Sequence, residues 1–293
     1  MHHKLPVSKY TSIKQLLYSY LLKSISIDTY KTESKYIKDE KIPLHKGRDD
    51  NRVFYTSSVS LRLSKSQNRK AMELASAIAS DLSGIGEDVF SIQIVPPGWI
   101  NFELTNSALA TWLHSLVVGS SWGAGEQGSR GAEEAINAQC PMPNLFTVQY
   151  AHARCCSLVL LAHREGLIKL REPIPNTSPA FWDVIFPNPL PWLNCDGTLQ
   201  LNHSDERRLI GELIQVVDNI ECPDVSSSVK WEKVALNLSQ AFEKFWSNCR
   251  IWGEIKITSP ELAQARLGLL MATQSVLRFV LEENLGVFAP LEL

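Results

Sequence analysis

The stretch of sequence that decides the fold reads FTVQYAHARCCSLVLLAH, at residues 146–163. Its length and apolar character predict one long helix from Thr147 to Glu165. Apolar residues recur at helical spacing in three further segments, at 204–217, 231–245 and 259–286. The first of these segments opens on Ser204, the expected N-cap. Residues 146–293 are therefore predicted to form an all-α bundle of four long helices.

The preceding residues, 51–118, have the pattern of a small α+β module. Helices are expected near residues 57–63 and 69–82, and a last helix over 108–118 closes the module. Residues 89–95 and 99–104 alternate apolar and polar positions around a Pro-Pro-Gly turn, which predicts two paired strands. The predicted fold class is α+β, with a small N-terminal α+β module followed by an all-α helical bundle.

Three segments lack a regular pattern. Residues 1–50 are expected to form a basic, partly ordered arm in which Ile13 to Ile25 could make one amphipathic helix. Residues 119–145 are rich in Gly and Ser and indicate a linker that would let the two halves separate by roughly 25 to 30 Å. Residues 173–197 form a proline-rich insertion in the bundle. Its aromatic residues either cover the core or dock a partner: Phe181, Trp182, Phe186 and Trp192.

Charge is divided unevenly along a chain whose net charge is only −2. Residues 1–70 hold 15 Lys and Arg against 6 Asp and Glu, whereas residues 71–293 hold 14 against 25. A basic N-terminal quarter favours contact with phosphate backbones, although a solvated basic arm has the same composition. The hydrophobic content of 44% and the lack of an 18-residue apolar run lead us to expect a soluble, cytoplasmic protein without a membrane partner.

The sequence offers no pattern for a metal, a cofactor or catalysis. Six cysteines form no CxxC pair and seven histidines form no HxxxH pair, so we expect reduced packing cysteines, no metal and no cofactor. The carboxylates are expected on the solvent faces of helices, and no glycine pattern follows a strand. We therefore expect a protein that is not an enzyme.

The hexapeptide Gln149-Tyr150-Ala151-His152-Ala153-Arg154 resembles the start of the anticodon-binding domain of arginyl-tRNA synthetases, called the DALR domain. Residues 238–251 and 265–277 resemble later segments of that domain, in the same order. The resemblance implies contacts to the anticodon loop from Tyr150, Arg154, Phe245, Trp246 and Arg250. A structural role is the alternative for each, with Tyr150 and Phe245 in the core and Arg154 tying helices together.

Residues 97–104, PGWINFEL, resemble the closing strand of the additional N-terminal domain of the same synthetases. In that family the domain leans on the tRNA elbow, which implies that Trp99 stacks on an unpaired base and Asn101 reads its edge, with Arg62 as a further elbow contact. Ordinary strand positions are the alternative for Trp99 and Asn101. Residues 62–66, RLSKS, resemble the KMSKS loop of class I synthetases, but they precede Trp99 and are taken as coincidence.

The resemblance implies a tRNA-binding protein that lacks the synthetase catalytic domain, with arginine tRNA as one candidate partner. Gln264 stands where the family's name-giving acid would be, and the chain ends APLEL, so the resemblance is incomplete. The acidic bundle favours the alternative, a synthetase-derived scaffold that binds a protein through residues 173–197.

Overall fold

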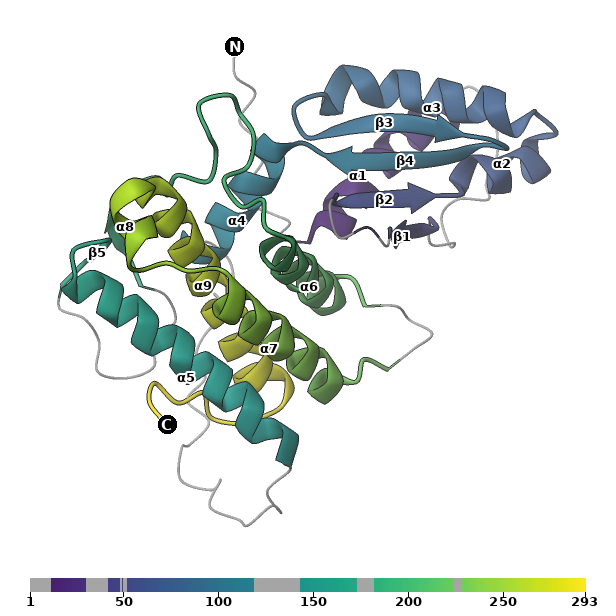
Figure 1. The fold of residues 1–293 in the computed structure, drawn as a ribbon. Coiled ribbons are helices and arrows are strands. Elements are labelled where there is room, and N and C mark those ends of the chain that lie inside the picture. Colours follow the sequence, from purple (N-terminus) through teal and green to yellow (C-terminus); the bar gives the residue numbers. More distant parts are fainter. Residues whose placement is uncertain are drawn as a thin grey trace.

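The computed structural model describes residues 12–29, 42–47, 49, 52–118, 143–172, 182–223 and 228–293. An N-terminal module with a small sheet packs against a helical bundle (Figure 1). The module contains α1 (Ile13–Thr29), β1 (Leu44–Lys46), β2 (Phe54–Ser57), α2 (Val59–Gln67), α3 (Ala71–Gly86), β3 (Phe90–Val95) and β4 (Trp99–Leu104). The bundle contains α4 (Asn106–Val118), α5 (Pro143–Arg164), β5 (Lys169–Leu170), β6 (Val184–Phe186), α6 (Ser204–Glu221), α7 (Trp231–Asn248), α8 (Glu254–Thr258) and α9 (Pro260–Phe279).

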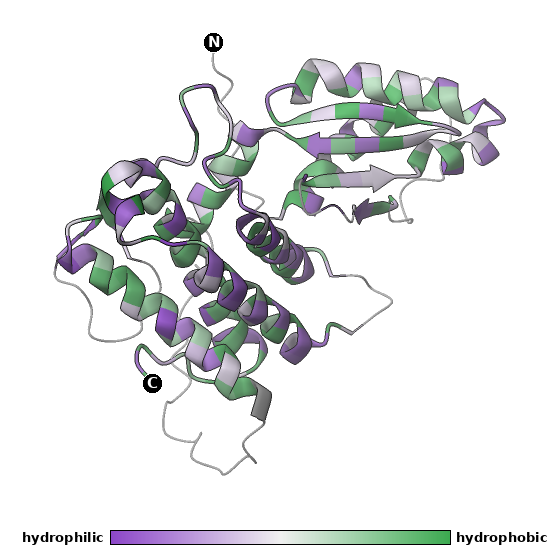
Figure 2. Cartoon of the chain, viewed as in Figure 1, coloured by the Kyte–Doolittle hydropathy of each residue, from purple (hydrophilic) through white to green (hydrophobic). Residues whose placement is uncertain are grey.

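The sheet of the module is antiparallel, with strand order β1-β2-β4-β3. Alternation along the strands separates its two faces, because successive side chains of a strand point to opposite sides (Figure 2). Tyr55, Ile100 and Phe102 are buried on the inner face. Helices α1 and α3 cover this face, where Tyr20 of α1 packs edge-on against Phe90 at a centroid distance of 5.3 Å. The outer face carries polar side chains.

Helices α1 and α4 belong to other parts of the fold than the sequence predicted. Helix α1 falls within the predicted arm, yet its i, i+4 stripe of Ile13, Leu17, Leu21 and Ile25 is buried in the core. The module therefore begins well before residue 51. Helix α4, expected to close the module, packs against α9 of the bundle instead. Its sequence shows an apolar helix but not which neighbour it covers. Strand β1 also falls within the predicted arm. Residues 1–11, 30–41, 48 and 50 of the arm, and residues 119–142 of the linker, lie outside the described residues.

Helix α9 is the centre of the bundle, and residues 263–274 are buried on all sides. A helix buried all round must pair its polar side chains. Arg266 does so through an ion pair of 2.6 Å between its Nε and Glu206 Oε1. Glu206 also accepts from the backbone N–H of His203, which makes His203, and not Ser204, the N-cap of α6. The expectation that all helical carboxylates face solvent is wrong for Glu206.

The described part of the proline-rich insertion, residues 182–197, folds back on α9. Trp182 and Trp192 are buried, so they cover the core and are not available to dock a partner. Trp192 reaches the backbone of α9 at Gly268, where a Cβ atom would lie 2.5 Å from the indole ring. Phe186 on β6 is 52% exposed, and Phe181 lies outside the described residues. Of the two roles weighed for this insertion, the structure assigns core covering to its two tryptophans.

The module is fixed to the bundle by hydrogen bonds to α6. The buried carboxylate of Asp218 accepts hydrogen bonds from the Tyr55 hydroxyl, from Ser12 Oγ at 2.8 Å and from the Lys14 backbone N–H at 3.1 Å. Lys46 Nζ of β1 donates to the Gly211 carbonyl at 2.7 Å. The burial of Asp218 again departs from the expectation of solvent-facing carboxylates. Desolvation raises its pKa, and the three hydrogen bonds oppose that rise.

This junction corrects the role given to the linker. A single residue, Thr105, separates β4 from α4, and α4 already packs on the bundle. Residues 119–142 therefore connect α4 to α5 within the bundle and do not join module to bundle. The expected separation of the two halves by 25 to 30 Å is wrong, because the junction at α6 holds them together.

Replacing Tyr55 by Phe should lower the free energy of unfolding by about 1 to 3 kcal/mol, because a buried carboxylate loses one hydrogen-bond donor. Urea unfolding followed by circular dichroism measures the change. Tyr150→Phe, on an exposed surface, is the matched control and should alter stability by less than about 0.5 kcal/mol. Equal effects of the two substitutions would contradict the stabilising role of the Tyr55 hydroxyl.

Candidate nucleic-acid interface

Two side chains of the hexapeptide at residues 149–154 help to hold the bundle together. His152 Nδ1 lies 2.8 Å from the Pro290 carbonyl oxygen, and its Nε2 lies 3.0 Å from Gln274 Nε2. A carbonyl only accepts, so Nδ1 carries the proton and Nε2 accepts from the Gln274 amide. Gln149 Nε2 donates to the Phe288 carbonyl at 2.9 Å. These two side chains of the hexapeptide fasten the C-terminal segment to α5.

Two other side chains of the hexapeptide, Tyr150 and Arg154, lie towards the surface. Tyr150 is 45% exposed and stacks on Phe146, with ring centroids 6.4 Å apart and an interplanar angle of 23°. Arg154, one turn further along α5, places its guanidinium carbon 5.2 Å from the centre of the Trp246 ring. Trp246 in turn packs edge-on against Trp252, with ring centroids 5.9 Å apart. We call the surface made by Phe146, Tyr150, Arg154, Trp246 and Trp252 the α5 face.

The α5 face carries the kinds of side chain that bind single-stranded RNA in proteins. Exposed rings stack on unpaired bases, and a guanidinium both stacks and pairs with phosphate. The cation–π contact with Trp246 holds the Arg154 side chain in place before any ligand binds. Phe146 and Trp252 were not predicted from the sequence. Phe146 lies one helical turn before Tyr150, and that i, i+4 spacing was the sequence pattern that could have indicated it.

Of two further expected anticodon contacts, Phe245 is buried and Arg250 is exposed. Phe245 has no exposed surface, because it belongs to the buried stripe of α7 with Leu238 and Phe242, so it is a core residue and not an RNA contact. Arg250 is exposed, and its backbone carbonyl accepts a hydrogen bond from the Arg266 guanidinium. The expected pair Tyr150 and Arg154 share one face, with Trp246 beside them.

The outer face of the sheet carries the expected elbow residues. Trp99 begins β4 and is 37% exposed, and Asn101 follows it on the same face. Asn101 pairs with Thr56 across the sheet, and its Oδ1 accepts from the Thr56 hydroxyl at 2.8 Å. That bond fixes the orientation of the Asn101 amide group. We call this surface, made by Thr56, Gln93, Trp99 and Asn101, the sheet face.

Arg62 is half-buried on α2. The same helix is tied to the β3–β4 turn by a hydrogen bond from the Ser60 hydroxyl to the Gly98 carbonyl. Figure 1 shows this turn at the outer tip of the module and α5 on the side of the bundle away from it. The sheet face and the α5 face are therefore widely spaced parts of one body.

Within the described ranges, no group of three or more His, Cys, Asp and Glu side chains is placed to hold a metal ion. One helix is long and apolar enough by composition to cross a membrane, over Leu145–Arg164 of α5. Half of that apolar window is buried inside the fold, where α5 packs against α7 and α9. Its apolar character is thus explained by its place in the bundle core.

A helical bundle with an exposed aromatic and guanidinium face, joined to a module with a tryptophan on its sheet, has the features of an RNA-binding protein. Residues 14–104 match the family described as Arginyl tRNA synthetase N terminal domain, and residues 148–293 match the DALR anticodon binding domain. The protein is therefore arginyl-tRNA synthetase-like and carries both kinds of domain in one chain. These domains imply a tRNA-related function.

Arginine–tRNA ligases are also similar to this chain. The ligase of Synechococcus sp. (strain JA-3-3Ab) is 32% identical over 144 residues, which are 49% of this chain and 21% of the ligase. The ligase of Salinibacter ruber is 31% identical over 147 residues, which are 50% and 21%. The chloroplastic/mitochondrial ligase of Arabidopsis thaliana is 30% identical over 131 residues, which are 44% and 16%. This chain spans about a fifth of such ligases, and no solved structure matches it.

The buried histidine of the hexapeptide makes stability depend on pH. The pKa of His152 is lowered to about 4, chiefly by burial and in smaller part by the Arg278 charge, while the hydrogen bond to Pro290 opposes this shift. The unfolded chain binds a proton here below about pH 6.5. The native state binds this proton only below about pH 4. Because the unfolded state binds more protons in this window, stability falls as pH falls from 6.5 towards 4.

Urea unfolding at pH 7 and pH 5 tests this prediction. His152 should account for a loss of about 2 kcal/mol between the two values. A His152→Asn variant will be less stable throughout, yet its loss between pH 7 and pH 5 should be smaller than that of the native sequence by about this amount. An equal loss in both proteins would show that His152 is not the group responsible.

Proposed function

We propose that this protein is a non-catalytic, cytoplasmic tRNA-binding protein that contacts the tRNA elbow through the sheet face and the anticodon stem-loop through the α5 face. The observation that carries the proposal is the α5 face itself, where the Phe146–Tyr150 stack lies one turn from an arginine held on Trp246. This face lies in or beside the part of the chain that matches an anticodon-binding domain.

The absence of catalysis is part of the proposal. Residues 105–147 are all that separates the two matched domains, and part of this interval is α4. Independent domains usually need 50 residues or more. A nucleotide-binding catalytic domain does not fit between the two parts. We infer that the chain holds a tRNA without charging it.

Affinity for phosphate should come mainly from the N-terminal side. Residues 1–70 carry an excess of basic over acidic residues, 15 against 6, whereas the remainder is acidic. Electrostatic attraction to the RNA backbone therefore acts at the module, and the α5 face contributes stacking. Because the module is fixed on α6, the distance between the sheet face and the α5 face is also fixed. Both faces must therefore contact one RNA at that distance.

A second candidate is a scaffold that binds another protein. Ile185 and Phe186 on β6 are exposed although neighbouring parts of the insertion are buried, and the acidic bundle is a poor surface for phosphates. Exposed apolar side chains of this kind are common at protein interfaces. In this alternative the synthetase-like faces no longer bind RNA.

Filter binding with total tRNA across a salt series separates the two candidates. Retention at 50 mM salt, with log affinity falling steeply against log salt, is expected if phosphates are held. Competition by arginine tRNA against other tRNAs then measures specificity. No retention at 50 mM salt would eliminate the tRNA-binding proposal and leave the scaffold.

Trp99→Ala, on the sheet face, should weaken tRNA binding by about 1 to 3 kcal/mol, because one base loses its stacking partner. Phe186→Ala is the matched control, since it removes an exposed aromatic residue from a surface to which the proposal gives no RNA contact. Both variants are compared at one salt concentration. An unchanged affinity for Trp99→Ala would make this residue an ordinary strand position.

Tyr150→Ala, on the α5 face, should also weaken binding by about 1 to 3 kcal/mol. An isolated anticodon stem-loop should show the loss, whereas Trp99→Ala should leave stem-loop binding unchanged, because the two residues are proposed to meet different parts of the tRNA. Loss of stem-loop binding in the Trp99 variant and not in the Tyr150 variant would contradict the assignment of the two faces.

A further inference from the structure

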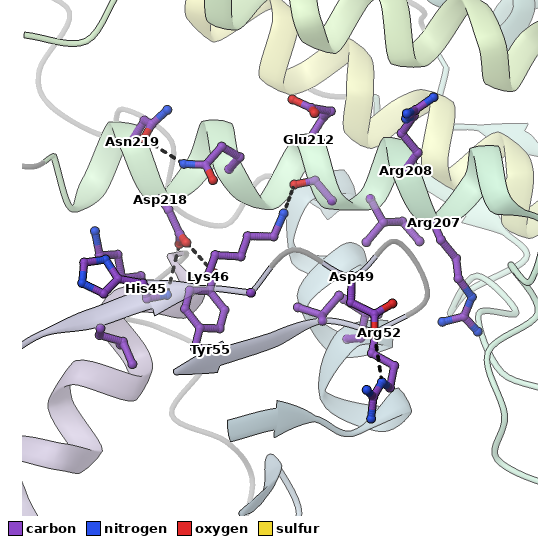
Figure 3. Close-up of a pocket in the computed structure, with 18 of the residues that line it drawn as sticks. His45, Lys46, Asp49, Arg52, Tyr55, Arg207, Arg208, Glu212, Asp218 and Asn219 are labelled. Carbon is purple, nitrogen blue, oxygen red and sulfur yellow. Dashed lines mark hydrogen bonds and ion pairs between the residues drawn. The ribbon is translucent and has the colours of Figure 1, made fainter. Parts of the chain in front are cut away.

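Two groups of basic residues in the described part of the module differ in what they contact. At the junction with the bundle, Lys46 donates to a backbone carbonyl of α6 and Arg52 pairs with Asp49, as Figure 3 shows. These side chains are engaged within the protein. The second group lies around the turn between α2 and α3, at the outer tip of the module in Figure 1: Lys65, Arg69 and Lys70. We call these three residues the basic tip.

The basic tip is a run of positive charge on a defined backbone. From residue 54 to residue 72 the chain has four Lys or Arg and no Asp or Glu. Helix α2 ends at Asn68, whose left-handed φ of 50° turns the chain away from the helix axis. Lys70 is then extended, with φ of −67° and ψ of 132°, and α3 begins at the next residue. Residues 69 and 70 therefore form a short connection between two helices.

The segment RLSKS, at residues 62–66, contributes only one residue to the tip. It lies within α2 and is helical. The hydroxyls of Ser64 and Ser66 donate to backbone carbonyls three residues earlier, at 2.8 and 3.0 Å. Because both serines are used inside the helix, the group that this segment presents at the tip is the exposed ammonium of Lys65, in the last turn of α2.

The basic tip lies next to the residue proposed to stack on an RNA base. At the start of α3, the Ala71 Cβ is 3.0 Å from the place where a Cβ on Gly98 would lie. Helix α2 contacts the same glycine, because the Ser60 hydroxyl donates to the Gly98 carbonyl. Lys70 precedes Ala71 and Trp99 follows Gly98, so each is one residue, about 3.8 Å, from this contact. Backbone packing thus holds the tip close to Trp99.

The cations of the tip are accessible to a ligand, since all three side chains are exposed. Among the described residues, no hydrogen bond, ion pair or ring contact engages the side chain of Lys65 or Arg69. Lys70 Nζ lies 3.7 Å from Glu73 Oε1, but both side chains are more than half exposed, and such pairs are weak. The segments that meet here, residues 64–73 and 95–99, contain no other Asp or Glu. The tip therefore keeps an excess of positive charge.

The position of Trp99 on its strand brings an RNA backbone to this charge. Trp99 is the first residue of β4, so the sheet continues on one side of it and ends on the other. A base that stacks on Trp99 with its edge towards Asn101 has its sugar and phosphates over the end of the sheet, where the tip lies. Lys and Arg side chains at such places bind phosphate oxygens and fix the register of the nucleic acid.

We propose that the basic tip binds the phosphates that flank the nucleotide stacked on Trp99. This inference rests on the proposed tRNA-binding function and adds a phosphate site to its elbow contact. The tip contributes affinity without sequence preference, because the backbone is the same in every tRNA. Trp99 contributes the contact with an unpaired base, and the two groups together hold one nucleotide from both ends.

The salt dependence of tRNA binding in the full chain tests the inference. Each phosphate held by a cation contributes about 0.7 to 0.9 to the magnitude of the slope of log affinity against log salt. Arg69→Ala should lower this magnitude by about that amount, and Arg69→Ala combined with Lys65→Ala by about twice as much. Arg69→Lys should restore most of the slope, because it keeps the positive charge.

An isolated anticodon stem-loop gives a second measurement. The tip is proposed to contact only the elbow, so the Lys65 and Arg69 variants should bind the stem-loop with the native affinity and slope. Lys169→Ala is the matched control, since it removes an exposed lysine of β5 that lies opposite Phe186, on a surface without a proposed RNA contact. It should leave the binding of whole tRNA unchanged. A circular dichroism melt of each variant reports folding.

Three outcomes overturn the inference, and they are distinguishable. If the native protein binds tRNA, Trp99→Ala weakens binding, and the double Lys65 and Arg69 variant retains the native slope, the tip does not hold the backbone while the proposed function stands. A lowered slope together with unchanged affinity of Trp99→Ala would show that the tip holds phosphates away from that residue. If the native protein retains no tRNA at 50 mM salt, the function and the tip assignment fail together.

Discussion

The buried carboxylate of Asp218 is the constraint on which the arrangement of the whole molecule depends. It is removed from water by the same packing that brings the module to α6, and its donors come from Tyr55, Ser12 and Lys14, all on the module side. A buried carboxylate without donors is costly, so the two parts are stable together only in this register. The positions of the sheet face and the α5 face relative to one another follow from it.

Local sequence patterns predicted the helices and strands well, but they predicted poorly which of these elements pack together. Alternation along 89–95 and 99–104 predicted β3 and β4, and the spacing in 231–245 predicted α7, because both signals come from one face of one element. The same reasoning assigned α4 to the module and the linker to the space between domains. Which neighbour an apolar helix covers is decided by long-range packing, which periodicity does not contain.

For the candidate site too, the sequence predicted some residues correctly and did not predict which residues they contact. Tyr150 and Trp99 are exposed and Arg154 is half-buried. Phe245 and Trp246 differ by one position, about 100° around the helix, and this rotation puts one in the core and one beside Arg154. The buried partners of Trp192 and Asp218 lie at Gly268 and Tyr55, far away in sequence. The close approach of Trp192 to Gly268 leaves no pattern in the local spacing of residues. The hydrogen bond between Asp218 and Tyr55 leaves none either.

The hydrogen bonds from Gln149 and His152 to the Phe288 and Pro290 carbonyls determine what can be appended to this protein. They hold Phe288 and Pro290 against α5, so any residues added after Leu293 start within a few residues of the helix that carries Tyr150. An affinity tag or a fused partner at that end would crowd the aromatic surface and depress binding for steric reasons alone. A small environment-sensitive dye placed there would instead change its emission when the surface is occupied.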